Sequence, residues 1–153
     1  AEVGADRIVN SVAAYEKYGG PLIIVDFGTA ITFDVVSRKG EYLGGAISPG
    51  VQLSLEALFE NAAKLPRVEL TDPRHVIGKS TVESVHSGAV HGFASLIDGM
   101  VSKIQGELDQ KARVIGTGGT VGLIVSRSNS IDIVDPFLTL EGLRIIHQRN
   151  QEG

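Results

Sequence analysis

Residues 22–47 constrain the fold more than any other part of the sequence. Residues 22–25 form a continuous aliphatic run, too short for a helix and bounded by Gly-Pro and Gly-Thr, which predicts a strand buried on both faces. Residues 31–35 alternate between apolar and polar side chains, and this period of two predicts a second strand. A turn at residues 38–40 leads to a third strand over 42–47. Three sequential strands joined by short turns predict an antiparallel meander.

Helical periodicity surrounds this meander. Residues 6–18 carry apolar side chains at helical spacing until Gly19-Gly20-Pro21 ends the pattern. A second helix opens at Pro49-Gly50 and ends before Pro66. The long segment from Ser80 to Leu108 repeats apolar residues at spacings of three and four, which predicts a long helix.

The last third of the chain alternates between strand and helix patterns. We expect a short strand over 113–115, a glycine-rich turn over 116–119, a short helix over 121–125, a strand over 131–134 and a last helix around Leu143. Residues 148–153 resemble a frayed tail. The whole order predicts a single α/β domain over residues 1–153, with a mixed sheet of about five strands and flanking helices.

Composition narrows the classes of function. At 153 residues with 42% hydrophobic and 21% charged residues, the chain is typical of one folded domain. A net charge of −4 gives no basic surface for nucleic acid, and no apolar run approaches the roughly 20 residues that span a bilayer. With no cysteine, disulfides and thiolate chemistry are excluded. We therefore expect a soluble, cytoplasmic protein with no nucleic-acid or membrane partner.

The segment from Asp26 to Thr32 is the strongest candidate for chemistry. A carboxylate ends a buried strand, and Gly28-Thr29 then turns the chain into the next strand. A tight glycine turn lets backbone N–H groups approach an anion, and the threonine hydroxyl adds a donor, which suits a phosphate. The alternative is an ordinary hairpin turn in which Asp26 only caps the backbone.

Three further segments each have an ordinary structural explanation. Residues 78–81 resemble the end of a phosphate-binding P-loop, but Pro73 stands where that motif needs its first glycine. Ser80 and Glu83 instead fit a capping box, which leaves the Thr81 hydroxyl open to a polar ligand. Residues 116–119 fit either an empty turn or a close approach to a planar ring such as adenine. Asp6 fits a favourable charge at a helix start.

Taken together, these segments resemble the type III pantothenate kinases, of the acetate and sugar kinase, Hsc70 and actin superfamily. Six motifs in the expected order carry the resemblance over nearly the whole chain: residues 4–7, 26–34, 44–50, 65–66, 78–81 and 117–119. The resemblance implies a ribonuclease H-like, actin-like ATPase half-domain as the fold. It also implies ATP-dependent phosphorylation of pantothenate to 4'-phosphopantothenate, the first step of coenzyme A biosynthesis.

Roles for individual residues follow from the same resemblance. Asp6 would accept the proton of the pantothenate hydroxyl, in a substrate-binding set of Gly4, Ala5, Asp6, Arg7 and Thr81. ATP would be bound by Gly28, Thr29, Gly118 and Gly119, and Asp26 would hold a monovalent cation, potassium or ammonium. A fixed arginine such as Arg7 suits a substrate carboxylate. The assignment requires that Asp6 and Asp26 converge on one anion-binding cleft.

The resemblance also implies that this chain is the second half of a two-half kinase. The first half, with the phosphate loop that holds most of the ATP and Mg²⁺, is absent from residues 1–153, so we expect this chain alone to be catalytically incomplete. The family forms homodimers. Two alternatives remain open: a non-catalytic regulatory or ligand-binding module on the same scaffold, and a superfamily kinase for a sugar or short acid, which would lack the loop over residues 4–7.

Overall fold

A computed structural model describes residues 4–152. The described chain forms ten elements in the order α1 (Ala5–Tyr18), β1 (Leu22–Phe27), β2 (Ala30–Val36), β3 (Tyr42–Pro49), α2 (Val51–Asn61), α3 (Thr81–Gly106), β4 (Arg113–Gly118), α4 (Val121–Val125), β5 (Ile133–Val134) and α5 (Leu138–Glu152). This is the element order that the sequence predicts.

The five strands form one mixed sheet in the order β3-β2-β1-β4-β5. β1, β2 and β3 pair antiparallel, and β4 and β5 continue the sheet in parallel with β1. The predicted meander and the predicted mixed sheet of about five strands are both confirmed. At the carboxyl end of β1, Asp26 lies opposite Thr32 of β2 on one side and Thr117 of β4 on the other.

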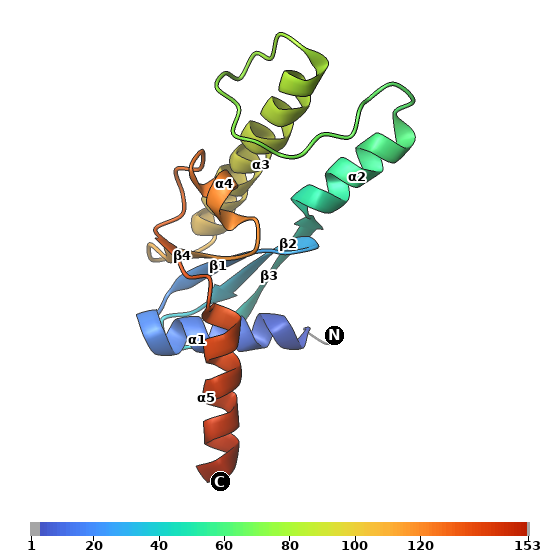
Figure 1. The fold of residues 1–153 in the computed structure, drawn as a ribbon. Helices are drawn as coiled ribbons and strands as arrows, with labels where there is room; N and C mark the ends of the chain where they lie inside the picture. Colours follow the sequence, from blue (N-terminus) through green and yellow to red (C-terminus); the bar gives the residue numbers. More distant parts are fainter. Residues whose placement is uncertain (1–3, 153) are drawn as a thin grey trace.

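Helices cover both faces of the sheet, in two unequal layers (Figure 1). One face packs against α2, α3 and α4, and its core includes Ile23, Val25, Phe27, Ile31 and Phe33. The opposite face packs against α1 and the start of α5 around a smaller core with Leu22, Ile24, Val36 and Leu138. Because side chains alternate along a strand, odd and even positions of β1 enter different cores.

The structure corrects two predicted boundaries in the sheet. β1 continues to Phe27, so Asp26 lies inside the strand and does not end it. The predicted glycine turn is also wrong, because Gly116 and Gly118 belong to β4. A Cβ at Gly118 would stand 2.6 Å from the Phe27 carbonyl oxygen, and its φ of +103° favours glycine. The glycine therefore permits a close approach between strands where the sequence pattern resembles a turn.

The predicted frayed tail is also wrong as far as Glu152, because α5 continues to that residue. Side-chain contacts one turn apart support its last two turns, from Arg144 to Gln148 and between His147 and Gln151. Arg149 also forms an ion pair with Glu16 of α1. Gly153 lies outside the described residues. Among the described helices, no stretch is both long and apolar enough to cross a bilayer.

Candidate functional site

Two acids interrupt the apolar face that β1 and β2 turn toward α1. Strand alternation places Asp26 on the same face as Leu22 and Ile24, which belong to the smaller core. By the same alternation Asp34 of β2 shares its face with Val36. The register pairs Asp26 with Thr32, two residues before Asp34, so the two carboxylates are diagonal neighbours on one face.

Helix α1 holds these acids with polar side chains from one of its faces. Arg7 Nε donates to Asp34 Oδ1 at 2.7 Å, and Asn10 Nδ2 donates to Asp26 Oδ2 at 2.8 Å. Farther along α1, Lys17 Nζ donates to Asp135 Oδ2 at 2.9 Å. Because positions 7, 10 and 17 recur at helical spacing, one face of α1 is fixed to three separate segments.

Asp26 is largely buried beside a neutral partner. Burial raises the pKa of its carboxyl group, the charges of Asp34 and Asp6 raise it further, and the hydrogen bond from Asn10 lowers it. The Asn10 amide is itself fixed, because Thr139 Oγ1 donates to its Oδ1 at 2.6 Å. Helix α1, which carries Asp6 in its first turn, packs on the face of the sheet that carries Asp26.

Asp26 has one oxygen suited to a cation. Its Oδ2 accepts from Asn10, while Oδ1 faces Gly118, where a Cβ would stand only 2.7 Å away. A carboxylate oxygen is a hard donor of the kind that small hard cations take, so Oδ1 has the donor chemistry for a monovalent cation. Within residues 4–152, no group of three or more His, Asp or Glu side chains could hold a metal ion.

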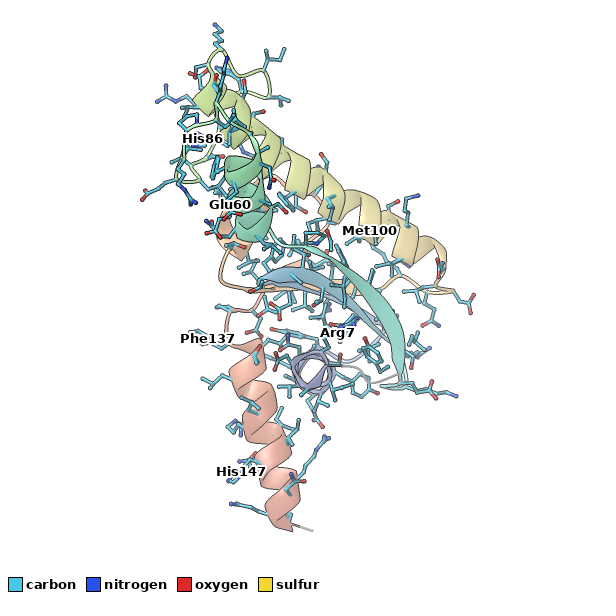
Figure 2. All side chains as sticks on the ribbon, turned by 90° about the vertical axis from the view of Figure 1, so that its right-hand side faces the viewer. Arg7, Glu60, His86, Met100, Phe137 and His147 are labelled. Atoms are coloured by element: carbon cyan, nitrogen blue, oxygen red, sulfur yellow. The ribbon has the colours of Figure 1, made fainter. Side chains whose placement is uncertain are left out.

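Arg7 lies between α1 and the sheet (Figure 2). Its partner Asp34 is fully buried, and the Arg7 side chain is 17% exposed. Tyr42 Oη also donates to Asp34 Oδ1, at 2.7 Å, and burial together with this bond raises the pKa of Tyr42 to about 12. Arg7 Nη2 is buried and has no hydrogen-bond partner among the described residues. The guanidinium is thus fixed by one nitrogen and has a free donor.

Asp6 lies in the exposed first turn of α1. Gly4 occupies the N-cap position without a side-chain cap, and Ala5 begins the helix. An exposed carboxylate at the N-terminus of a helix is favoured by the helix dipole and remains available to a ligand. Its side chain therefore keeps the accessibility that a proton acceptor needs.

The Gly28-Thr29 turn follows Phe27, the last residue of β1, and is exposed. Gly28 N–H is used within the turn, donating to the Ala30 carbonyl at 3.1 Å, while Gly50 N–H donates to the Thr29 carbonyl at 2.9 Å. A Cβ at Gly50 would stand 2.2 Å from that carbonyl, so the start of α2 packs directly under the turn. Gly118 lies beside Asp26, and Gly119 follows it at the exposed end of β4.

Thr81 lies apart from this group. It begins α3 and, with apolar residues of α2 and α3 such as Leu58 and Phe93, lines a groove of about 360 Å³. Figure 2 places His86, in the second turn of α3, on the opposite side of the sheet from Arg7. The structure therefore brings Asp6, Arg7 and Asp26 together but does not bring Thr81 to them within one chain.

The start of α3 has the predicted cap. Glu83 N–H donates to Ser80 Oγ at 3.2 Å, and the Glu83 carboxylate accepts from the Lys79 N–H at 2.7 Å. The reciprocal bond reaches Lys79, one residue before the position that a regular capping box uses. The capping prediction is confirmed with this shift, and the Thr81 hydroxyl remains exposed.

Sequence reasoning missed four residues that shape the site: Asn10, Asp34, Tyr42 and Thr139. For two of these residues, Asp34 and Asn10, the sequence contained a signal. Asp26 and Asp34 both replace an apolar residue at an inward position of an alternating strand, and buried carboxylates require partners. Arg7 and Asn10, three apart on the preceding helix, are suitable donors. Thr139 left no comparable signal, because it is 129 residues from its partner.

The sheet order and the helices on both faces define a class by fold, the actin-like ATPase fold, with a polar cluster at the carboxyl end of β1. A putative Baf family transcriptional activator from Campylobacter jejuni has a similar fold, with a TM-score of 0.65 at 21% identity over 95% of this chain and 65% of that one. So does the activator of 2-hydroxyisocaproyl-CoA dehydratase from Clostridium difficile, with bound ADPNP, at a TM-score of 0.52 and 11% identity over 97% of this chain and 69% of that one. The predicted fold class is confirmed.

The chain belongs to the type III pantothenate kinase family. The model of that family matches residues 1–103. The type III pantothenate kinase of Moorella thermoacetica is 59% identical over 149 residues, which is 97% of this chain and 59% of the relative. That of Geotalea daltonii is 57% identical over 152 residues, 99% of this chain and again 59% of the relative. The chain thus spans 59% of the length of these curated relatives.

Proposed function

We propose that the protein containing this chain transfers the γ-phosphoryl group of ATP to pantothenate and forms 4'-phosphopantothenate. The observation that supports the proposal is that α1, with an exposed acid, Asp6, and a fixed arginine, Arg7, in its first turn, packs on the face of the sheet that carries Asp26. Phosphoryl transfer needs few covalent functions from the protein, because catalysis is mainly positioning and charge stabilisation. This cluster offers a base, an anion-binding cation and a cation-binding carboxylate.

In the proposed reaction the pantothenate hydroxyl oxygen bonds to the γ-phosphorus while the bond from that phosphorus to the β–γ bridging oxygen breaks. The hydroxyl proton passes to the Asp6 carboxylate, and ADP leaves with the bridging oxygen. Gly4 and Ala5, at the N-cap and first position of α1, would line the same substrate site as Asp6 and Arg7, although the structure forms a helix start there and not the predicted loop. Arg7 would bind the substrate carboxylate through a free Nη donor.

Nucleotide and cations would lie at the carboxyl ends of β1 and β4. Gly28 and Thr29 are exposed beside Asp26, and Gly118 and Gly119 end the adjacent strand. Asp26 Oδ1 would hold potassium or ammonium, whose charge would offset the phosphates. We further propose that a preceding half of the protein, outside these residues, supplies the main phosphate loop and Mg²⁺. The greater length of the curated relatives supports this division.

Thr81 would contribute to the same chemistry from a second subunit. Because Thr81 begins α3, which packs on the opposite face of the sheet from α1 (Figure 1), its proposed contact with pantothenate requires another copy of the chain, which is consistent with a homodimer. The exposed apolar residues Leu58 and Val82 near this groove are suitable for burial in such a contact. We propose that the protein acts in the cytoplasm, where pantothenate and ATP are available.

The test is pantothenate-dependent release of ADP by the full-length protein, with potassium or ammonium compared with choline. Activity that requires both pantothenate and a small monovalent cation is the expected result. Calorimetric titration with pantothenate, glycerol and acetate separates this reaction from that of another superfamily kinase. If glycerol or acetate binds and pantothenate does not, the substrate assignment fails. Asp6→Asn and Thr81→Ala then test the two proposed substrate contacts.

One observation favours a second candidate, a regulatory module. The Campylobacter jejuni structure with a similar fold is titled a putative transcriptional activator. The net charge of −4 disfavours direct contact with DNA, so such a module would act through a protein or small ligand. Full-length protein that binds pantothenate and ATP but releases no ADP under any cation would favour this candidate.

A further inference from the structure

We infer that Asp34 is a positioning residue, which holds Arg7 so that its free Nη donor meets the carboxylate of the substrate. The inference rests on the proposed function, because it deepens the role of Arg7 in binding pantothenate. The Asp34 side chain is 0% exposed, and its oxygens already accept from Arg7, Tyr42 and Thr32. Its effect must therefore pass through the residues that contact it.

The contacts of Asp34 fix one edge of the guanidinium. Arg7 Nε and Tyr42 Oη each donate to Asp34 Oδ1 at 2.7 Å, and Thr32 Oγ1 lies 3.5 Å from Oδ2. Tyr42 also presents its ring 6.0 Å from the Arg7 guanidinium carbon. A planar guanidinium bound at Nε and flanked by a ring has few orientations left, so the direction of its other nitrogens is set.

A second nitrogen of the guanidinium, Arg7 Nη2, indicates that a ligand binds here. Arg7 Nη2 is buried yet has no hydrogen-bond partner among residues 4–152, and buried polar groups in native proteins are normally paired. It lies over Gly45, where a Cβ would stand 2.7 Å from it. The absence of a side chain at position 45 thus leaves room for the guanidinium.

Of the ligands in the proposed reaction, the pantothenate carboxylate suits this donor better than a phosphate. Arg7 extends from the same turn of α1 as Asp6, whose proposed partner is the pantothenate hydroxyl. The proposed phosphate contacts, Gly28 and Thr29, instead follow β1. Because a carboxylate accepts hydrogen bonds from arginine in a planar arrangement, its binding depends on how the guanidinium is directed.

The experiment compares two ligands that differ only at this group. Calorimetry on the full-length protein would measure pantothenate and pantothenol, in which a primary alcohol replaces the carboxylate, and would include ATP as a reference. We expect Asp34→Ala to weaken pantothenate binding about tenfold or more, because Arg7 loses its orientation. Binding of pantothenol and of ATP should change less than about threefold.

Two further variants test whether Asp34 acts by orienting Arg7, and not through its negative charge or through an effect on folding. Asp34→Asn keeps an acceptor for Arg7 Nε and should restore most of the preference for pantothenate. Tyr42→Phe retains the carboxylate but removes the second donor to Oδ1, and should lower the preference about two- to threefold in a protein that still folds. If Asp34→Ala does not fold, as judged by circular dichroism, Tyr42→Phe decides.

A matched control uses the other end of the same helix. Asp135→Ala removes the hydrogen bond from Lys17 of α1 to Asp135 and does not touch Arg7. An equal loss of preference in Asp135→Ala would mean that any loosening of α1 has this effect, and the inference would be wrong. Equal weakening of both ligands in Asp34→Ala would also overturn it. Wild-type protein that binds neither ligand would reject the proposed function, whereas binding with an unchanged preference rejects only the role of Asp34.

Discussion

The two ends of α1 hold buried acids by different means. At the amino end, Asn10, a neutral amide, holds Asp26, whose pKa is raised above its usual value by burial and by the charges of Asp34 and Asp6. At the carboxyl end, Lys17 and Tyr18 both donate to Asp135. Burial raises the pKa of Asp135, but these hydrogen bonds outweigh it and hold the pKa below the usual value.

This difference supports the proposal that the amino end of α1 binds a ligand, whereas the carboxyl end stabilises the fold. Asp135 is satisfied within the chain, and the hydrogen bonds to Asp135 and Glu141 raise the pKa of Lys17 in return. Asp26 is less well compensated, because its partner Asn10 is neutral and the nearby charge of Asp34 raises its pKa further. An excess of negative charge next to a predicted phosphate turn is costly without a cation, and a bound cation would remove that cost.

Asp6→Asn is expected to have the largest effect. Removing the proposed proton acceptor should lower the rate of pantothenate phosphorylation about 10²- to 10⁴-fold. Because Asp6 is exposed, the unfolding midpoint should hardly change. A coupled ADP-release assay measures the rate, and a thermal melt on the same sample measures the unfolding midpoint. A variant that loses stability and activity together would mean that Asp6 stabilises the fold, as Asp135 does.

Arg7→Met is expected to have the next largest effect, this time on folding. The substitution leaves the fully buried Asp34 without its cation, and breaking such a pair typically costs about 3–5 kcal/mol in the free energy of unfolding. Lys17→Met is the matched control on the same helix. Since Lys17 is well exposed, its loss should cost clearly less in urea denaturation. Equal costs would remove the distinction between the two ends.

Asp135→Asn should destabilise the protein by about 1.5–3 kcal/mol at pH 7, because it weakens charge-assisted hydrogen bonds from Tyr18 and Lys17. The pKa of Asp135 is lowered in the folded state, so its contribution is present above the unfolded value near 3.8 and is lost as pH falls through the folded value. Unfolding measured from pH 7 to pH 3 should therefore show the wild type and variant converging in acid.

The sequence predicts the scaffold well because periodicity reports burial. The long helix α3 and the meander β1–β3 have strong apolar repeats, and both lie where the patterns place them. The glycines at 116 and 118 were misread because a glycine needed for a turn and one needed for a close strand contact have the same local signature. Only the tertiary packing of β4 against β1 distinguishes them.

The site is less predictable because its contacts are long-range. Asp26 and Asp6 could be proposed from motifs, but the bond from Thr139 to Asn10 and the shared hydrogen bonds of Asp34 depend on how α1, α5 and the sheet pack. Local patterns carry no information about such pairings. What the sequence does contain is a rule for finding candidates: a charged residue at an inward strand position, with a polar residue on a helix that covers that face.

Asp26→Asn should have the smallest effect on stability, and its sign should be opposite to that of Asp135→Asn. Because the folded-state pKa of Asp26 is raised, the charged carboxylate destabilises the fold once pH exceeds the unfolded value near 3.8, and the penalty is complete above the folded pKa. Asparagine removes the charge and can still accept from Asn10, so in choline buffer the variant should melt at a higher temperature than the wild type at pH 7. The gain should shrink as pH falls and disappear below 3.8, where the wild-type carboxyl is protonated in both states. Adding potassium should stabilise the wild type and leave the variant unchanged.

A variant that is less stable than the wild type at pH 7 without potassium would contradict the comparison, because Asp26 would then be as well satisfied as Asp135.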